Sequence, residues 1–285
     1  MRQVRVVPKL PRRRRDSHKG TFGHVLVLGG SPGLTGAPVL AGEGALRSGA
    51  GLATIGCPRA VQPVIASRTT CVMSLPLPDT PGGHLSHTAL APALRFSTRC
   101  RAVVLGPGLG RDPDTGEFVR SFVTSVEAAT VVDADGLNLL AGHGDSLRGA
   151  PGSFVLTPHP AEAGRLLGAP TASPVPADRR KALEELVDLT GAVVVFKGHG
   201  TLVSDGKRLY RNNTGNPGMA TGGTGDVLSG MIAALLAQGL APFEAAVLAV
   251  HLHGRAGDLA AKKVGEVSLM ATDLLDALPG AFGRS

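Results

Sequence analysis

Short apolar segments that end in glycine, proline or charged residues recur along this chain, and they constrain its fold more than any other feature. Six such segments are Val25–Leu28, Leu52–Cys57, Ala102–Leu105, Thr130–Val132, Phe154–Thr157 and Ala192–Phe196. Short, continuously apolar runs are typical of strands that are buried on both faces of a parallel sheet. Helical patterns separate several of them. The sequence therefore predicts a three-layer α/β/α domain with a mostly parallel central sheet.

The stretches between these strands supply the expected helices and one hairpin. Helices are predicted at Ala37–Ser48, Asp114–Ala128, Ala177–Thr190, from Thr224 onward, and at Pro242–Lys263. The Asp205-Gly206 pair predicts a hairpin that joins its two flanking apolar runs. Residues 58–100 contain several prolines and glycines, and we expect an extended surface segment without chemistry there. With no internal repeat and no long linker, residues 19–285 are expected to form one domain.

The basic charge of the chain is confined to its first residues. The 285-residue chain has a formal net charge of +7, and residues 1–19 contain eight basic side chains and one acidic one. The rest of the chain is balanced, and we expect residues 1–18 to form a flexible, solvated basic arm. Nucleic-acid binding by the Arg12–Arg15 run is disfavoured, because such binding needs basic groups spread over a surface. Aromatic residues, on which bases stack, make up only 3% of the chain.

The cysteines and the hydropathy pattern bear on the compartment. Cys57, Cys71 and Cys100 are odd in number and too widely spaced for a CxxC metal site, so we expect buried, reduced thiols. The N-terminus lacks the apolar segment of a secretory signal, and no run of 18 or more apolar residues occurs. The sequence therefore predicts a soluble cytoplasmic protein without a membrane segment.

Residues 212–230 combine glycines, hydroxyl groups and a single carboxylate. The glycines nearest that carboxylate are Gly222, Gly223 and Gly225. They let the backbone approach a ligand closely, and N–H groups at the start of the helix expected from Thr224 form a cradle for phosphate oxygens. Asp226 beside this cradle repels a resting phosphate, so we expect it to take the proton of an attacking hydroxyl. The alternative is a charge that only favours the helix dipole.

Two common nucleotide-binding fingerprints do not occur. The loop Gly29–Gly36 follows the first strand, at the edge of the sheet where ligands bind in such folds, but it lacks the GxGxxG spacing. No GxxxxGK[ST] motif occurs either. The second glycine-rich turn, Gly106–Gly110, is interpreted equally well as a binding turn or as a simple bend.

Charged and polar residues follow three further strands. After the strand Thr130–Val132 come Asp133, Asp135 and Asn138, which could hold Mg²⁺ through water or cap the next helix. We favour capping for Asp135. Asp133 and Asn138 stay candidates for contact with Mg²⁺ through water. Prolines on both sides restrict His159, which favours a ligand contact over a purely structural role. Lys197 is either a phosphate contact or a surface cation.

The histidine pair near the C-terminus is a weak metal candidate. His251 and His253 lie two residues apart within the predicted helix Pro242–Lys263. Residues at that spacing point to different faces of a helix. We therefore expect no metal site there.

Six motifs, in order along residues 19–280, resemble those of the ADP/ATP-dependent NAD(P)H-hydrate dehydratases of the ribokinase-like superfamily. They are Gly29-Gly30-Ser31 with Gly36-Ala37, Leu105–Gly110, Asp133–Asn138, Thr157–Glu162, Lys197–Thr201, and Asn213–Asn216 with Gly222–Asp226. The Gly-Thr-Gly-Asp element alone indicates only a ribokinase-like kinase. The resemblance implies that ADP or ATP phosphorylates the ring hydroxyl of the S epimer of NADHX or NADPHX, and that loss of phosphate restores NADH or NADPH.

The resemblance also implies which residues bind. Residues expected to contact the hydrated cofactor are Ala37, Gly108, His159 and Asp226, with Asp226 as the catalytic base. Residues expected to hold the adenine nucleotide are Lys197, Gly198, His199, Gly200, Thr201 and Gly225, and those expected to form an anion hole are Gly222, Gly223 and Thr224. Mg²⁺ is expected with the phosphates, mostly through water and substrate oxygens, and no residue is named as a metal ligand.

Several features depart from the family or remain open. Many family members carry an epimerase domain in front, whereas only the basic arm precedes Lys19 here, so we expect a separate epimerase chain. Members often form tetramers, and we expect a homo-oligomer. The nearest alternative is a small-molecule kinase of the same superfamily that acts on a vitamin-precursor alcohol. The sequence fits ADP or ATP as the phosphoryl donor and NADHX or NADPHX as the substrate.

Overall fold

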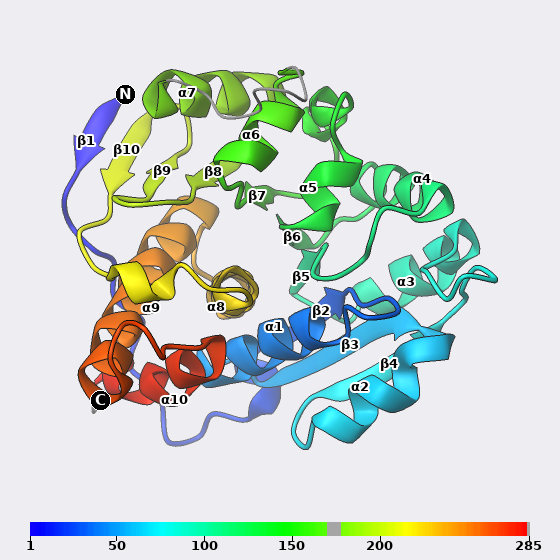
Figure 1. Cartoon of the computed structure of the whole chain (residues 1–285), viewed down its shortest axis with the longest axis horizontal. Helices are drawn as coiled ribbons and strands as arrows, with labels where there is room; N and C mark the ends of the chain where they lie inside the picture. The colour runs from blue at the N-terminus through cyan, green and yellow to red at the C-terminus, as the bar shows by residue number, and fades with distance from the viewer. Residues whose placement is uncertain (170–177, 284–285) are drawn as a thin grey trace.

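One continuous sheet organises the structure, a computed structural model that describes residues 1–169 and 178–283. Its strands are β1 Arg2–Val4, β2 His24–Leu28, β3 Leu52–Pro58, β4 Met73–Leu77, β5 Ala102–Leu105, β6 Ala129–Val132, β7 Phe154–Leu156, β8 Val193–Phe196, β9 Leu202–Ser204 and β10 Arg208–Arg211. From edge to edge the ten strands follow the order β1-β10-β9-β8-β7-β6-β5-β2-β3-β4. Figure 1 shows this sheet crossing the molecule between two groups of helices.

Each neighbouring pair in the series β8-β7-β6-β5-β2-β3-β4 is parallel, as predicted. β9 runs antiparallel between β8 and β10, which confirms the hairpin through Asp205-Gly206. Because the central strands are parallel, their carboxyl ends all lie on the same side of the sheet. The glycine-rich and charged turns noted in the sequence therefore meet on that side.

The helices form the two outer layers. They are α1 Gly36–Arg47, α2 Gln62–Arg68, α3 Leu90–Ser97, α4 Pro113–Val123, α5 Asp135–Leu139, α6 Pro160–Leu166, α7 Arg179–Thr190, α8 Thr224–Ala237, α9 Pro242–Val264 and α10 Ala271–Phe282. The helices α3 to α7 pack on one face of the sheet, and α1, α2, α8, α9 and α10 on the other (Figure 1). The three-layer α/β/α prediction is confirmed.

Alternate residues of the central strands enter different cores. In β2, Val25 and Val27 pack toward α1 and α8, whereas Leu26 and Leu28 pack toward α3 and α4. All four side chains are fully buried. Burial on both faces explains why the strand segments are continuously apolar in the sequence and do not alternate with polar residues.

Glycines allow α1 and α8 to pack closely. A Cβ at Gly230 of α8 would lie 1.9 Å from the Ala41 carbonyl oxygen, and a Cβ at Gly44 of α1 would lie 2.8 Å from the Val227 carbonyl oxygen. Neither position has room for a side chain. Because Asp226 lies in the first turn of α8, this contact helps to fix the position of Asp226 relative to the sheet.

Residues 58–100 do not form the extended surface segment that the prolines indicated. They contain α2, α3 and the edge strand β4, in which Pro76 pairs with Cys57 of β3. An edge strand tolerates proline because one side of its backbone needs no partner. The helix expected at Asp114–Ala128 ends at Val123.

The first residues of α7 also differ from the sequence prediction. The helix that was expected from Ala177 begins at Arg179 among the residues that the structure describes. Ala177 itself lies outside them. Asp178 caps the helix by accepting hydrogen bonds from the N–H groups of Arg180 and Lys181.

The N-terminal segment is docked on the domain and is not the free arm expected from its charge. Residues Arg2–Val4 pair with β10 as a parallel edge strand, and Val4, Val7 and Leu10 pack against the core. Arg13 donates a 2.8 Å hydrogen bond to the Gly49 carbonyl oxygen and lies over the Phe22 ring. Main-chain pairing with a sheet edge does not depend on side-chain charge, so the charge pattern did not reveal it.

Two of the three cysteines are placed as expected. Cys57 and Cys100 are buried, whereas Cys71 is exposed, which corrects the prediction for that residue. Burial raises the pKa of each buried thiol to about 12, so both stay protonated. Within residues 1–169 and 178–283, no helix combines the length and the apolar character needed to cross a bilayer.

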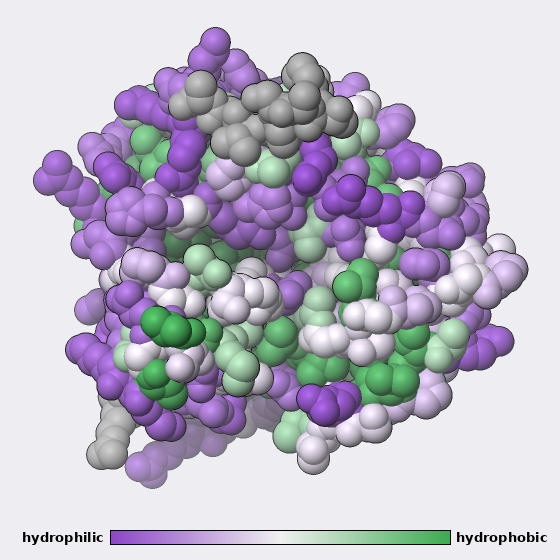
Figure 2. Space-filling model, viewed as in Figure 1, coloured by the Kyte–Doolittle hydropathy of each residue, from purple (hydrophilic) through white to green (hydrophobic). Residues whose placement is uncertain are grey.

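The visible surface is mostly hydrophilic, with apolar residues in separate patches (Figure 2). Among the residues that the structure describes, the exposed large apolar side chains are Val6, Leu34, Val64, Met73, Leu259, Val267 and Met270. Scattered apolar residues of this kind are ordinary on folded proteins.

Gly230→Ala should destabilise the fold, because its new methyl group overlaps the backbone of α1. We expect the free energy of unfolding to fall by about 1–3 kcal/mol, as for other overpacked cores. Urea unfolding measures the change. Gly36→Ala, at the start of α1, is the matched control, because a Cβ there meets nothing within 4 Å. Equal stability of the two variants would contradict the close α1–α8 contact.

Candidate active site

The start of α8 forms the floor of the candidate site. Gly223 precedes the helix in the left-handed conformation, with a φ of 91°. The Thr224 hydroxyl donates to the carbonyl oxygens of Met219 and Thr221 at 3.0 and 3.1 Å, which holds the preceding turn in place. The first N–H groups of a helix lack intrahelical acceptors and carry partial positive charge. The phosphate cradle that the sequence predicts therefore has the required backbone geometry.

A histidine of α9 is hydrogen-bonded to the first turn of α8. His253 Nε2 donates a 2.9 Å hydrogen bond to the Thr224 carbonyl oxygen. Burial lowers the pKa of His253 to about 4, although the bond to Thr224 favours the charged form. The imidazole is thus neutral near pH 7 and acts as a simple donor. The sequence alone gave this residue no role.

The Asn-Thr-Gly-Asn segment that leads into the cradle is anchored on α9. Asp258 accepts hydrogen bonds from the Gly215 N–H at 3.0 Å and from the Asn216 amide at 3.2 Å. A Cβ at Gly254 would lie 2.2 Å from the Thr214 hydroxyl oxygen, so only glycine lets the segment approach the helix. Asp258 was not predicted from the sequence, and the glycines inside an alanine-rich helix were the available signal of a close approach.

Lys197 is held by two buried carboxylates. Its Nζ lies 2.8 Å from Asp133 Oδ1 and 3.8 Å from Glu162 Oε2, and these acidic side chains are only 1% and 5% exposed. Burial alone would lower the pKa of Lys197, but the charges of Asp133 and Glu162 outweigh it and raise the pKa. A Cβ at Gly225 would be 3.3 Å from this Nζ. Lys197 is therefore a charged group at the start of α8 and not a surface cation.

Asp226 has the properties of a base that works near neutral pH. Burial, and then the charge of Asp133, raise the pKa of Asp226 to about 7, and Lys197 opposes the shift. A carboxylate that merely favoured the helix dipole would have a lowered pKa. Asp226 instead exchanges its proton near pH 7, where a general base is most useful.

The Pro-His-Pro segment ends in a capping box at the start of α6. His159 Nδ1 accepts hydrogen bonds from the N–H groups of Ala161 and Glu162, and Glu162 Oε2 accepts from the His159 N–H at 2.8 Å. Burial, and then Lys197, lower the pKa of His159, so its ring is neutral and carries its proton on Nε2. Contact of His159 with a substrate stays a prediction.

Glu162 is the acidic residue to which the sequence analysis gave no role. Its side chain reaches both the His159 N–H and the Lys197 ammonium. Burial raises the pKa of Glu162 to about 7, and Lys197 opposes the shift. Glutamate three residues after a capping residue was a sequence signal for the cap, but not for this buried pairing.

Asp135 does not cap α5, which corrects our preferred interpretation. Its Oδ2 accepts the Gly110 N–H at 3.0 Å and its Oδ1 accepts the Asn138 amide at 3.2 Å. Asn138 Oδ1 in turn accepts from Arg165 at 2.8 Å. The backbone turns at Ala134, which has a φ of 52°, and this turn directs Asp135 toward the neighbouring glycine-rich loop.

The two glycine-rich loops after β2 and β5 touch each other. Ser31 Oγ donates to the Gly108 carbonyl oxygen at 2.8 Å. Gly108 has a φ of 66°, and a Cβ there would lie 2.4 Å from the Leu34 carbonyl oxygen and 3.4 Å from the Ala37 Cβ. Ala37 and Gly108, both expected to contact the hydrated cofactor, are thus adjacent.

The turn from Lys197 to Thr201 connects β8 to β9. Gly198 and Gly200 have positive φ values, 131° and 61°, and the Thr201 hydroxyl donates to the Gly198 carbonyl oxygen at 2.9 Å. His199 is exposed. Of the residues expected to hold the nucleotide, Lys197 and Gly225 are brought together directly.

The residues present suit a metal that arrives with its ligand. Within the described ranges, no group of three or more His, Cys, Asp or Glu side chains could hold a metal ion. Asp133 is engaged by the Lys197 ammonium. Mg²⁺ keeps several waters and binds phosphate oxygens readily, which suits an ion that enters with a phosphate ligand.

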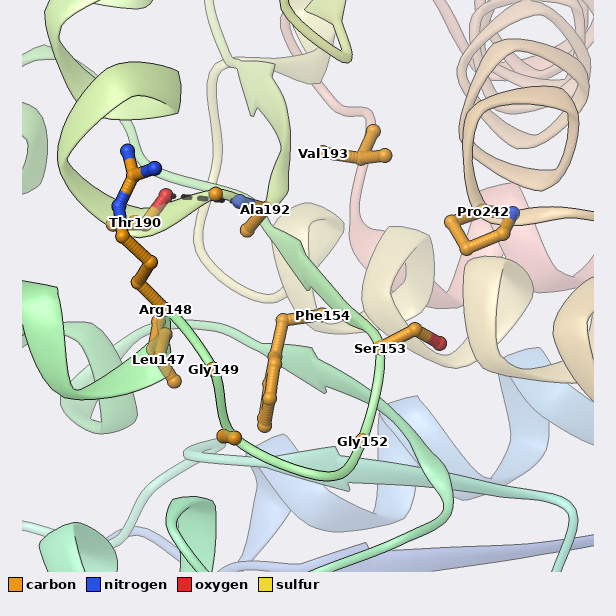
Figure 3. A pocket seen from close by; sticks show the side chains of 12 residues that line it. Leu147, Arg148, Gly149, Gly152, Ser153, Phe154, Thr190, Ala192, Val193 and Pro242 are labelled. Carbon is orange, nitrogen blue, oxygen red and sulfur yellow. Dashed lines mark hydrogen bonds between the residues drawn. The ribbon is translucent and has the colours of Figure 1, made fainter.

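A separate cavity of about 400 Å³ lies where strands β7 and β8 begin, at the end of the sheet opposite the candidate site. Phe154 and Val193, which line it, are the first residues of β7 and β8, and Pro242 begins α9 (Figure 3). The Thr190 hydroxyl on its wall accepts the Ala192 N–H at 3.2 Å (Figure 3). This cavity is distant from the strand ends that carry the charged groups, and we assign it no role.

Asp226→Asn should change how stability depends on pH. The folded-state pKa of Asp226, about 7, lies above the ordinary value of 3.8. Folding therefore favours the protonated form, so this group costs stability as the pH rises from about 4 to about 7. We compare the free energy of unfolding of the asparagine variant with that of the wild type. This difference should shift in favour of the variant by about 2–4 kcal/mol between pH 4 and pH 8.

Urea unfolding at pH 4 and pH 8 measures this effect. Asp188→Asn, which changes an exposed aspartate of α7, is the control and should leave the pH dependence unaltered. A parallel pH dependence of the Asp226 variant and the wild type would show that Asp226 is an ordinary carboxylate.

Comparison with known proteins identifies the family. The sequence model described as NAD(P)H-hydrate dehydratase matches residues 25–280. The bifunctional NAD(P)H-hydrate repair enzyme Nnr of Moorella thermoacetica is 49% identical over 273 residues, which cover 95% of this chain and 51% of that protein. The ADP-dependent (S)-NAD(P)H-hydrate dehydratase of Neisseria meningitidis is 40% identical over 271 residues, covering 93% of this chain and 86% of that protein.

Solved structures agree with this assignment. The ADP/ATP-dependent NAD(P)H-hydrate dehydratase of Bacillus subtilis, co-crystallized with ATP and Mg²⁺, has a TM-score of 0.81 and 32% identity, and the match covers 96% of this chain and 93% of that one. A hydroxyethylthiazole kinase of Pyrococcus horikoshii, with a TM-score of 0.59 and 15% identity, shares the fold alone. The chain spans about half the length of the bifunctional relative. This chain belongs to the NAD(P)H-hydrate dehydratase family and has its ribokinase-like fold.

Proposed function

We propose that this protein converts the S epimer of NADHX or NADPHX to NADH or NADPH, with ADP or ATP as phosphoryl donor. The observation that carries the proposal is Asp226, a partly buried carboxyl group at the start of α8 whose pKa burial raises to about 7, near the Lys197 ammonium. A base, a cation and helix-start N–H groups together suit phosphoryl transfer to a hydroxyl. Membership of the dehydratase family supports this choice of reaction.

Each group has a role in the proposed reaction. Asp226 takes the proton of the ring hydroxyl as that oxygen attacks the terminal phosphoryl group. Lys197, Gly222 and Gly223 in the turn before α8, and the first N–H groups of α8 from Thr224 onward stabilise the negative charge on the transferred group. The bond from the ring carbon to the phosphate oxygen then breaks, and the adjacent ring carbon loses a proton to water, so that phosphate leaves and the double bond is restored. Glu162 and Asp133 keep Lys197 charged and in place.

The nucleotide and metal are part of the proposal. The Neisseria relative is ADP-dependent, and the Bacillus relative was crystallized with ATP and Mg²⁺. We propose that Lys197–Thr201 and Gly225 hold the adenine nucleotide. Bound Mg²⁺ would neutralise phosphate charge. Ala37, Gly108 and His159 would contact the hydrated cofactor, and the adjacency of Ala37 and Gly108 supports this.

The kinase alternative would use Asp226 and the same cradle. The comparisons favour the dehydratase, because curated relatives at 40–49% identity carry dehydratase or repair names. The kinase neighbour matches at only 15% identity. The bifunctional relatives also support a role for an NAD(P)HX epimerase in the same pathway. Homo-oligomer formation and a cytoplasmic location stay predictions.

The purified protein should restore NADH from NADHX in the presence of Mg²⁺ and ADP or ATP, and the rise in NADH absorbance measures this. Only the carboxylate form of Asp226 accepts a proton, so kcat/KM should rise with pH and level off above about 7. Asp226→Asn should reduce kcat by roughly 10²-fold or more, the usual scale for loss of a general base.

Two controls accompany this assay. Omission of the nucleotide should abolish turnover, and Asp188→Asn should retain it, because that residue is exposed and remote from the strand ends. A folded protein that binds nucleotide but leaves NADHX unchanged would overturn the dehydratase assignment. A screen of small alcohols would then test the kinase alternative.

A further inference from the structure

Two arginines lie against the turn Lys197–Thr201. Arg179, the first residue of α7, donates through Nη1 to the His199 carbonyl oxygen at 2.7 Å, and through Nη2 to the carbonyl oxygens of Phe196 and Lys197 at 3.1 and 3.2 Å. These three bonds fix the path of the turn. Arg179 therefore positions the residues that the family resemblance assigns to the adenine nucleotide.

The glycines of the turn make room for both guanidinium groups. A Cβ at Gly198 would lie 3.3 Å from Arg179 Nη2, and a Cβ at Gly200 would lie 2.9 Å from Arg211 Nε. Arg211, at the end of β10, thus sits directly against the Cα of Gly200. A side chain at either glycine would displace an arginine.

In the part of the chain that the structure describes, Arg179 and Arg211 form no ion pair with a carboxylate, whereas neighbouring arginines do. Arg180 pairs with Glu184, and Arg208 pairs with Asp205 and Glu244. Within residues 1–169 and 178–283 no carboxylate forms an ion pair with Arg179 or Arg211, and residues 170–177 contain no Asp or Glu. Burial, and then the charge of Arg211, lower the pKa of Arg179. The two like charges are therefore close enough to repel each other, and an anion would relieve that repulsion.

We propose that Arg211 binds a phosphate group of a ligand seated on the turn Lys197–Thr201, while Arg179 positions that turn. Both terminal nitrogens of Arg179 are engaged by backbone carbonyls. Arg211 is exposed, and its planar fork can turn toward an oxyanion. This inference rests on the proposed function, which places a phosphorylated ligand there. The phosphate belongs either to the adenine nucleotide or to the 2′-position of NADPHX.

Calorimetric titration of the full-length protein tests the proposal, with ADP and Mg²⁺ as one probe and the pair NADP⁺ and NAD⁺ as the other. Arg211→Gln should weaken ADP binding by about tenfold or more, the usual scale for a charged hydrogen bond. Lys207→Gln is the matched control, because it removes one positive charge from an exposed position of the same hairpin. It should leave every affinity unchanged.

The second probe identifies the source of the phosphate. If ADP binding is unchanged but Arg211→Gln removes a preference for NADP⁺ over NAD⁺, the bound group is the 2′-phosphate and the site stands. If neither probe responds, or if the wild type binds neither ADP nor NADP⁺, the proposal is overturned. Binding is measured without turnover, so a lack of dehydratase activity would overturn the proposed function while these titrations still decide the role of Arg211.

Arg179→Lys tests the positioning role separately. Lysine keeps the charge but cannot bridge three carbonyl oxygens, so ADP binding should weaken although the charge near Arg211 is retained. Arg180→Gln, at the next residue of α7, is exposed and is the control. Unchanged ADP affinity in Arg179→Lys would show that the turn holds its shape without Arg179.

Discussion

The ion cluster around Lys197 is the interaction on which the rest of the site depends. An ammonium group from the end of β8 is held between carboxylates from the end of β6 and the start of α6, at 2.8 and 3.8 Å. Buried charges are costly unless they are paired, so this cluster persists only because the acids and the base compensate one another. Asp226 lies near this cluster, and burial, followed by the charge of Asp133, raises its pKa.

The fold brings these groups together through a parallel sheet and a close helix contact. Parallel strands place Asp133, His159 and Lys197 at one edge, because each follows the carboxyl end of its strand. The glycine contact between α1 and α8 then brings Asp226 to the same edge. Asp258 and His253 of α9 hold the chain on either side of the cradle. Rigid elements thus define the site, and its glycines let these elements approach one another.

Sequence patterns predicted much of the fold for physical reasons, and the structure brings Lys197 and Gly225 of the candidate site together. The buried strands and α8 have strong local periodicity, and the glycine turns have local chemistry. The pairing of Lys197 with Asp133 spans 64 positions, and no local pattern encodes it. The edge strands β1 and β4 were missed because main-chain pairing of an edge leaves little trace in side-chain composition. Asp135 was assigned to the nearest helix, whereas its partner is the Gly110 N–H of another loop.

In the proposed reaction, the ring hydroxyl leaves as phosphate after Asp226 has activated it. The most direct measurement uses NADHX that carries ¹⁸O in that hydroxyl, with unlabelled ADP or ATP, and mass analysis of the inorganic phosphate released. Because the hydroxyl oxygen attacks the phosphoryl group and departs with it, each phosphate formed should contain one ¹⁸O. Unlabelled phosphate with ¹⁸O in the water would contradict the account, because the hydroxyl would then have left without being phosphorylated.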